Sequence, residues 1–399
     1  MFQITCSRIL FVLSTVMASA MASEPKLEIV AEWNSLPYRI KSESVKKTWE
    51  SSKLFGKALL HGVKVDGRGN IYVSTSRWGG KEIPATLSKV VRDGDAWVLQ
   101  AFPSEEMNDV DNPDGLKAVL GFEIDRNDVM WILDQGHIAG APSGQKDEKL
   151  ILWDLKTNRE IQRYIFSEKD SDKKGSFLND LAIDNDTGFA YIADSGIFSR
   201  PLSGGLIIYD SHANRARRIL DKSPFTTNDP NFFFNIDGNA VTKDGPMLTG
   251  ADGIALSGDK KTLYWTNLTG NTLYSLDTEP LRDFLTPENE IAGSVREVCT
   301  LPSNTDGITS DRDGNLYMTA LTLNGIMRRD AKTGAITRYV YHREMSWPDT
   351  VGWGPDKSLY VVSNHLNLYV QDDMDFSAPA VSNFRIWRIV DVGESYTKK

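Results

Sequence analysis

The sequence ADGIALSGDKKTLYWTN, residues 251–267, contains two short apolar runs separated by a polar turn. An acidic residue and a glycine precede the first run, and the second run contains two aromatic residues. Apolar runs of this length, bounded by turn residues, are typical of paired antiparallel strands. The stretch therefore predicts a β-hairpin.

The same phrase recurs along the chain. Six copies lie 43 to 72 residues apart, beginning at residues 61, 120, 179, 251, 305 and 348. A supersecondary unit repeated at such intervals indicates a repeat architecture, and a unit with several short strands is typical of a propeller blade. We therefore expect an all-β fold, a six-bladed β-propeller that forms one domain over residues 23–399. Helix content should be minor.

Both ends of the mature chain have strand patterns. The sequence LEIVAEW occupies residues 27–33 and FRIWRIVDV occupies residues 384–392. Terminal strands of propellers commonly complete one shared blade, because this leaves no open sheet edge. We expect that closure here, and we expect the chain beyond Gly393 to be loose.

The first 22 residues have the pattern of a secretory signal peptide. A basic Arg8 precedes an apolar run over residues 9–17, and small residues surround Ala20 and Ala22. The run is too short to span a bilayer, and no later stretch is long and apolar enough to do so. We expect cleavage after Ala20 or Ala22, a secreted or periplasmic product, and no membrane insertion afterwards. Cys299 then remains as a single cysteine, so no disulfide forms within the mature chain.

Charge and motifs exclude several classes of function. The formal net charge is −9 and the isoelectric point about 5.2. Nucleic-acid binding requires a basic surface that displaces counterions, and the sequence has no basic stripe. It also has no phosphate-binding glycine loop, no His-Glu-x-x-His zinc motif and no Gly-x-Ser-x-Gly nucleophile motif. A small-molecule ligand is the expected partner, and the oligomeric state is left open.

One position in each repeat carries most of the candidate chemistry. It is the position just before the apolar core of each inner strand, occupied by His61, Leu120, Asn179 with Asp180, Asp252, Asp306 and Asp349. The innermost strands of a propeller line its channel, so equivalent positions converge. Clustered carboxylate and amide oxygens suit a hard cation, with Ca²⁺ favoured, and His61 would also suit a transition metal. The alternative is that Asp-Gly before a strand serves only as turn chemistry.

Other stretches are candidates for the rim of such a site. A second set of polar residues follows the second strand of the repeats: Asp134, Asp194, Asn267 and Asn364. Two connections, residues 104–116 and 221–247, are longer than a blade needs. The second contains three consecutive phenylalanines from Phe232, which favour a lid packed over one face of the ring. A packing excursion without a ligand role is the alternative.

Several long phrases carry a family resemblance. They are AVLGFEIDRNDVMWILDQG at 118–136, FLNDLAIDNDTGFAYIADSG at 177–196, GADGIALSGDKKTLYWTNLTGNTLYSLDTEPLRD at 250–283, and WPDTVGWGPDKSLYVVSNHLN at 347–367. With them the chain resembles the yellow / major royal jelly protein family, including its bacterial members. The resemblance implies a secreted six-bladed propeller whose central channel binds a small ligand. Some relatives bind biogenic amines and some are linked to dopachrome conversion. The cysteines of the insect members are missing here.

The predicted fold is also similar to that of the regucalcin / gluconolactonase group, which holds a divalent metal in the channel. By repeat position, the metal ligands of that group fall on His61, Asn179, Asp252 and Asp306. Asn179 and Asp306 match in residue type. Asp252 replaces an Asn and His61 replaces a Glu.

Three hypotheses of function follow. The first is a propeller that binds an aromatic or amine-like ligand, with tautomerisation of a dopachrome-like substrate as one reaction. Asp252 or Asp306 would then be the general base. Ligand contacts would come from the remaining polar candidates, namely His61, Asn179, Asp180, Asp349, Asn267 and Asn364. The second hypothesis is a metal-dependent lactonase, and the third is a non-enzymatic interaction scaffold.

Overall fold

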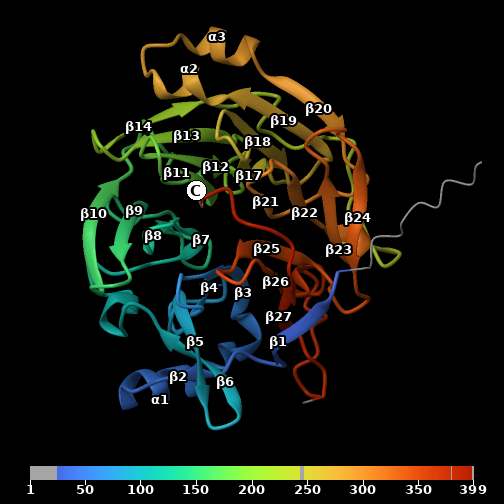
Figure 1. Cartoon of the computed structure of the whole chain (residues 1–399). Helices are drawn as coiled ribbons and strands as arrows, with labels where there is room; N and C mark the ends of the chain where they lie inside the picture. The colour runs from blue at the N-terminus through green and yellow to red at the C-terminus, as the bar shows by residue number, and fades with distance from the viewer. Residues whose placement is uncertain (1–24, 243–246, 379, 398–399) are drawn as a thin grey trace, which may run out of the picture.

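Six antiparallel sheets surround a central channel in the computed structural model (Figure 1). The structure describes residues 25–242, 247–378 and 380–397. The expected signal peptide lies outside these residues. The six-bladed propeller predicted from the repeats is confirmed, because each copy of the repeated phrase forms the two innermost strands of one blade.

The strands of each blade follow one another from the channel outwards. The first blade has β3 (Leu59–Val65), β4 (Ile71–Ser76), β5 (Leu87–Asp93), β6 (Ala96–Ala101) and a parallel fifth strand, β2 (Tyr38–Arg39). The second has β7 (Val119–Ile124), β8 (Val129–Asp134), β9 (Lys149–Asp154) and β10 (Arg159–Ile165). The third has β11 (Leu178–Asp184), β12 (Phe189–Asp194), β13 (Gly205–Asp210) and β14 (Arg215–Ile219).

The other three blades have the same order. The fourth has β17 (Ala251–Leu256), β18 (Thr262–Asn267), β19 (Thr272–Asp277) and β20 (Arg296–Thr300). The fifth has β21 (Ile308–Ser310), β22 (Leu316–Ala320), β23 (Gly325–Arg329) and β24 (Ile336–Tyr341). The sixth has β25 (Pro348–Trp353), β26 (Leu359–Ser363), β27 (Phe384–Ile389) and β1 (Leu27–Trp33).

The ring closes through its two ends, as the terminal patterns predicted. Strand β1 pairs antiparallel with β27, so that Leu27 lies opposite Ile389 and Trp33 lies opposite Phe384. This pairing of the two ends of the chain completes the sixth blade, and from β1 the chain continues into the first blade.

The aspartate that ends the inner strand of several blades closes the hairpin. Asp311 accepts hydrogen bonds from the backbone N–H of Asn315 at 2.8 Å and from the hydroxyl of Tyr317 at 3.1 Å. Asp66 does the same with Asn70 and Tyr72. The repeated phrase of an aspartate, a turn and an aromatic residue is therefore a local folding signal.

Glycines allow the inner strands of neighbouring blades to approach at the level of their backbones. A Cβ at Gly253 would lie 2.3 Å from the carbonyl oxygen of Asp306, and one at Gly121 would lie 2.4 Å from that of Asn179. A Cβ at Gly307 would lie 2.6 Å from the carbonyl oxygen of Asp349. Each glycine thus faces the candidate position of the next blade, and no side chain fits between them.

The end of the chain corrects one expectation. Instead of being loose after Gly393, residues 394–397 enter the channel, and Figure 1 shows this red segment running to the centre of the ring. Ser395 pairs with Asp311, and the buried Tyr396 accepts a hydrogen bond from the backbone N–H of Ile183. The segment is held because it fills space that the inner strands leave open.

Helices are few in the described residues: α1 (Glu43–Ser52), α2 (Thr278–Arg282), α3 (Glu288–Gly293) and α4 (Leu366–Tyr369). Helices α2 and α3 lie between β19 and β20, so that β20 completes the fourth blade only after both of them. In the part of the chain that is described, none of the helices has the length and hydropathy to cross a membrane.

The glycine contacts make a stability prediction. Gly253→Ala is expected to lower the free energy of unfolding by about 1–3 kcal/mol, because overpacking must push two backbones apart. Gly293→Ala is the control: its Cβ meets nothing within 4 Å, so we expect almost no change. Chemical denaturation of both variants measures the difference. Equal stability of the two variants would contradict the close approach.

Candidate functional site

Irregular pairing in the inner strands places the candidate residues in the channel. The register between the first and second strands of a blade shifts between Leu60 and Val63, and between Ala251 and Ile254. The same shift occurs in three more blades. A bulge redirects the side chains of its extra residues. The bulges contain His61, Leu120, Asn179, Asp252 and Asp349, and Asp306 lies two residues before β21.

These side chains meet in one chamber of the channel. Its wall includes all six equivalent candidates: His61, Leu120, Asn179, Asp252, Asp306 and Asp349. The rest of the lining is mostly apolar: Trp78, Phe177, Ile197, Met247, Thr249, Leu268 and Leu366. The chamber has a volume of about 30 Å³. This is room for one or two water molecules or for the head group of a larger ligand.

One half of the chamber is a histidine held by a carboxylate. Asp349 Oδ2 lies 2.9 Å from His61 Nδ1 and accepts a hydrogen bond from Asn364 Nδ2 at 2.7 Å. Its Oδ1 accepts from the hydroxyl of Thr350. In the neutral imidazole, the contact with Asp349 places the hydrogen on Nδ1. Nε2, which is buried without a hydrogen-bond partner, is then left as a free acceptor.

The other half is a pair of carboxyl groups. Asp252 and Asp306 hydrogen-bond to each other. Burial raises the pKa of both well above the usual range, and the charge of Asp349 raises it further. Asn179 Nδ2 donates to Asp252 at 2.7 Å, and Trp347 Nε1 donates to Asp306 at 2.8 Å. A pair of this kind shares one proton, because two buried carboxylates in contact cannot both ionise.

This arrangement does not fit a metal centre. Within the described ranges, no group of three or more His, Cys, Asp or Glu side chains is placed to hold a metal ion. The oxygens of Asp252 and Asp306 are engaged with each other, and Asn179 presents its N–H group to Asp252. The set expected from the regucalcin-like pattern therefore comes together in space, but its donors are used within the protein.

Asp180 belongs to a second polar layer of the channel. It lies near Lys64, whose Nζ is 3.0 Å from Glu123 Oε2 and donates to the carbonyl of Val351. Burial raises the pKa of Asp180 to about 6, and Lys64 offsets part of this rise. The sequence placed Asp180 beside the other candidates, but the structure separates it from the walls of the chamber.

Of the second predicted set, the polar residues that follow the second strands, only one contacts a residue of the chamber. Asn364 contacts the chamber residue Asp349, whereas Asn267 Nδ2 donates to the carbonyl of Thr227 at the start of the long 221–247 connection. Asp134 and Asp194 accept backbone N–H groups from the segments that precede the inner strands. These last three therefore support loops.

An aromatic wall runs outwards from His61. The centroids of His61 and Trp78 lie 4.6 Å apart, those of Trp78 and Phe177 6.1 Å, and those of Phe177 and Phe198 5.6 Å. The last ring in the row, His137, lies 4.6 Å from Phe198. The wall thus contains rings from three blades: Trp78 follows β4 of the first blade, His137 follows β8 of the second, and Phe177 and Phe198 flank the inner strands of the third.

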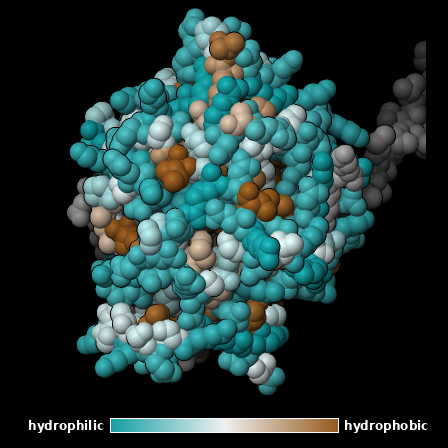
Figure 2. Space-filling model, turned by 90° about the vertical axis from the view of Figure 1, so that its left-hand side faces the viewer, coloured by the Kyte–Doolittle hydropathy of each residue, from teal (hydrophilic) through white to brown (hydrophobic). Residues whose placement is uncertain are grey.

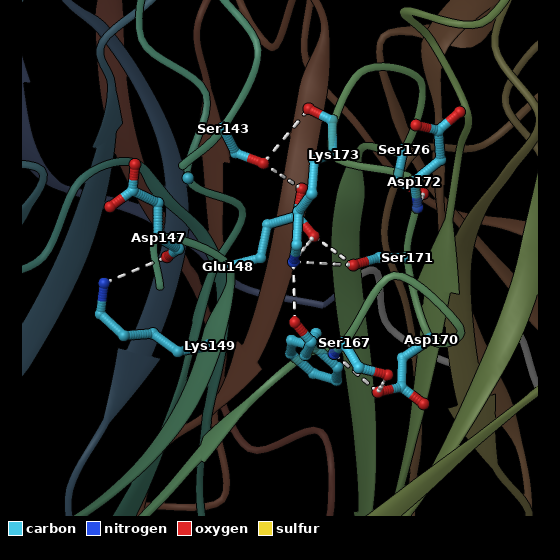
Figure 3. A network of polar contacts seen from close by, with 12 residues as sticks. Ser143, Asp147, Glu148, Lys149, Ser167, Asp170, Ser171, Asp172, Lys173 and Ser176 are labelled. Carbon is cyan, nitrogen blue, oxygen red and sulfur yellow. Dashed lines mark hydrogen bonds and ion pairs between the residues drawn. The ribbon is translucent and has the colours of Figure 1, made fainter. Parts of the chain in front are cut away.

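A buried polar network supports this wall (Figure 3). Glu148 is fully buried and accepts hydrogen bonds from Ser143, Ser171 and Lys173, with Lys173 Nζ at 2.8 Å. Burial raises the pKa of Glu148, but His137 and Lys173 outweigh it and keep the pKa below its usual value. The network ties together the two segments that carry His137 and Phe177.

Sequence reasoning missed Trp78, Phe177, Ile197 and Trp347. A signal existed for the roof of the chamber, because Trp78, Ile197, Leu268 and Leu366 all follow the second strand of a blade by one to three residues. The 221–247 connection reaches the site as expected of a covering segment: Met247 lines the chamber and Phe234 is buried. Phe233, however, is 64% exposed.

Comparison with known proteins identifies the family. The family model described as "Major royal jelly protein" matches residues 118–391. The chain belongs to the major royal jelly protein family. It is 27% identical to major royal jelly protein 1 of Apis mellifera over 237 residues, which cover 55% of this chain and 50% of that protein. Major royal jelly protein 7 is 24% identical over 287 residues, 68% of this chain and 60% of that one. The match spans about half the length of the first of these relatives.

Solved structures support the fold. A luciferin-regenerating enzyme aligns with a TM-score of 0.54 at 14% identity, covering 93% of this chain and 97% of that one. A calcium-binding regucalcin from Agrobacterium tumefaciens aligns with a TM-score of 0.51 at 14% identity, covering 86% and 94%. At these identities the likeness shows the propeller and nothing about the reaction.

The carboxyl pair makes a prediction about stability and pH. A carboxyl group whose pKa is raised by folding stabilises the fold below its unfolded pKa, and this stability is lost as pH rises through the folded pKa. Asp306→Asn imitates the protonated state. We expect it to unfold with a higher free energy than the wild type, by about 1–3 kcal/mol near pH 7, and with no advantage near pH 4.

Urea denaturation between pH 4 and 8 measures this difference. Asp277→Asn, at a half-exposed aspartate paired with Arg296, is the matched control and should show no such trend. A wild type that is more stable than Asp306→Asn at pH 7 would show that the pair does not share a proton.

Proposed function

We propose that this chain binds the polar head of a small organic ligand in the central chamber and transfers a proton on it. The supporting observation is that His61 Nε2, which has no hydrogen-bond partner, and the proton-sharing carboxyl pair line the same chamber. Isomerisation by general acid–base catalysis requires a base and an acid that face the same cavity and have different environments.

The proposed step is a tautomerisation. His61 Nε2 takes a proton from a carbon next to a conjugated carbonyl, and the electron pair of that C–H bond moves towards the carbonyl oxygen. The Asp252–Asp306 pair gives its proton to that oxygen. One proton leaves the substrate and one arrives, so no oxidant or reductant is needed. This assigns the base to His61 and the acid to the aspartates, because a carboxyl group with a raised pKa holds its proton at neutral pH.

The chamber also favours the ligand class that the family resemblance suggests. Its lining, as far as the chain is described, contains several carboxyl groups and no Lys or Arg, so a ligand with a cationic amine would relieve their repulsion. Trp78 and Phe177 offer an aromatic surface at the same place. The volume of about 30 Å³ admits only the head group of a ligand. To bind, the ring of the ligand would therefore have to push aside the apolar side chains of the roof, Trp78, Ile197, Leu268 and Leu366. Aromatic amines and dopachrome-like molecules meet these conditions.

We include secretion in the proposal, on the basis of the N-terminal sequence pattern. The scaffold alternative would be favoured by a large apolar surface. Figure 2 shows one side of the molecule, and the apolar side chains on it are small and separate groups in a hydrophilic surface. That side offers no continuous apolar patch for a protein partner.

Calorimetry with dopamine and a spectrophotometric dopachrome assay test the proposal. Asp306→Asn keeps the charge of the proton-sharing pair but has no proton to give, so binding should persist while kcat falls roughly 10²–10⁴-fold. His61→Gln should behave in the same way. The double variant Asp252→Asn with Asp306→Asn removes the negative charge, and it should also lose dopamine binding.

Controls separate the alternatives. Asp277→Asn should keep both binding and turnover. Titration of the chelator-stripped protein with Ca²⁺ tests the lactonase hypothesis, in which a divalent cation would occupy the same carboxylates. Stoichiometric Ca²⁺ binding that is lost in the double variant would overturn the proposal, as would full turnover by His61→Gln.

A further inference from the structure

Trp347 connects the two halves of the chamber without lining it. Its indole N–H donates to Asp306 Oδ2 at 2.8 Å, on the acid side. Its backbone carbonyl accepts a hydrogen bond from the N–H of Asn364 at 3.3 Å. Asn364 in turn donates to Asp349, which holds His61. A single residue therefore contacts the acid directly and the base through two further residues, the first of them by its backbone N–H.

The backbone of Trp347 is strained. Its φ is +47°, in the left-handed region that bulky residues rarely adopt, and it directly precedes Pro348. Such a conformation is unfavourable and persists only where the surroundings impose it. Here the indole is fully buried and packs on Phe234, with ring centroids 5.6 Å apart. A residue in an ordinary backbone conformation could fill the same space. The strained conformation therefore indicates that the direction of the indole N–H group, towards Asp306, is what matters.

We propose that Trp347 is a positioning residue that orients the carboxyl group of Asp306 towards Asp252 and fixes it relative to His61. This inference rests on the proton transfer proposed above. Without the indole N–H, the Asp306 carboxyl group is free to rotate away from its partner. The proton it delivers is then no longer aimed at the substrate oxygen.

The test is Trp347→Phe, which keeps an aromatic ring and removes the N–H group. Trp265→Phe is the matched control, because Trp265 is also fully buried and its indole donates to a carbonyl, that of Phe225, at 2.9 Å. With dopachrome as substrate, we expect Trp347→Phe to lower kcat roughly 10–100-fold with KM changed less than twofold. Trp265→Phe should leave both constants unchanged. Equal kcat values for the two variants would overturn the proposal.

An infrared measurement separates this proposal from the proposed function. In protein labelled with [¹³C]aspartate, the C=O stretch of the protonated pair should move to higher wavenumber in Trp347→Phe and stay in place in Trp265→Phe. An unmoved band would overturn the positioning role. If the wild type does not convert dopachrome, the proposed function fails, but the band still decides the role of Trp347.

A second variant covers a failure of Trp347→Phe to fold. Phe234→Leu leaves the N–H group in place and loosens the support of the indole. It should shift the same band by a smaller amount and lower kcat at least threefold. A band and a kcat equal to those of the wild type would count against the proposal.

Discussion

The innermost strands of neighbouring blades approach each other so closely that their backbones determine the shape of the channel. Where Gly121, Gly253 and Gly307 face the next blade, the backbones of two inner strands come together with no side chain between them. The channel is therefore narrow, and the residue beside each glycine has no room except in the channel. Bulges at the same level turn these side chains inwards.

A narrow channel lined by carboxyl groups is costly, because burial and mutual repulsion oppose their ionisation. The three carboxyl groups of the chamber have different surroundings. Asp349 contacts His61 and accepts hydrogen bonds from Asn364 and Thr350, whereas Asp252 and Asp306 share a proton. This division creates a hydrogen-bond acceptor at His61 and a proton donor at the carboxyl pair. Buried carboxyl groups lower the stability of the fold, and groups of this kind are typically found at functional sites.

Much of the fold was readable from the sequence, because each blade repeats the same local signals. The aspartate, the turn and the aromatic residue of the hairpins are visible in the sequence around Asp311, and so is the convergence of equivalent positions on the channel. The sequence does not indicate that Asp252 and Asp306 share a proton, because this depends on distances between different blades. Trp347 lies outside the repeated phrase, and its role depends on a backbone conformation that no pattern indicates. Tyr396 is buried against residues of different blades, among them Ile183 and Ser310, and no local pattern indicates such contacts.

The positions of two hydrogens distinguish the acid from the base in the chamber, and neutron diffraction from crystals grown in D₂O near pH 7 locates both. We expect deuterium between the carboxyl oxygens of Asp252 and Asp306, deuterium on His61 Nδ1 facing Asp349, and none on His61 Nε2. A carboxyl pair without deuterium, or an imidazole that carries deuterium on Nε2 alone, would contradict the assignment of acid and base.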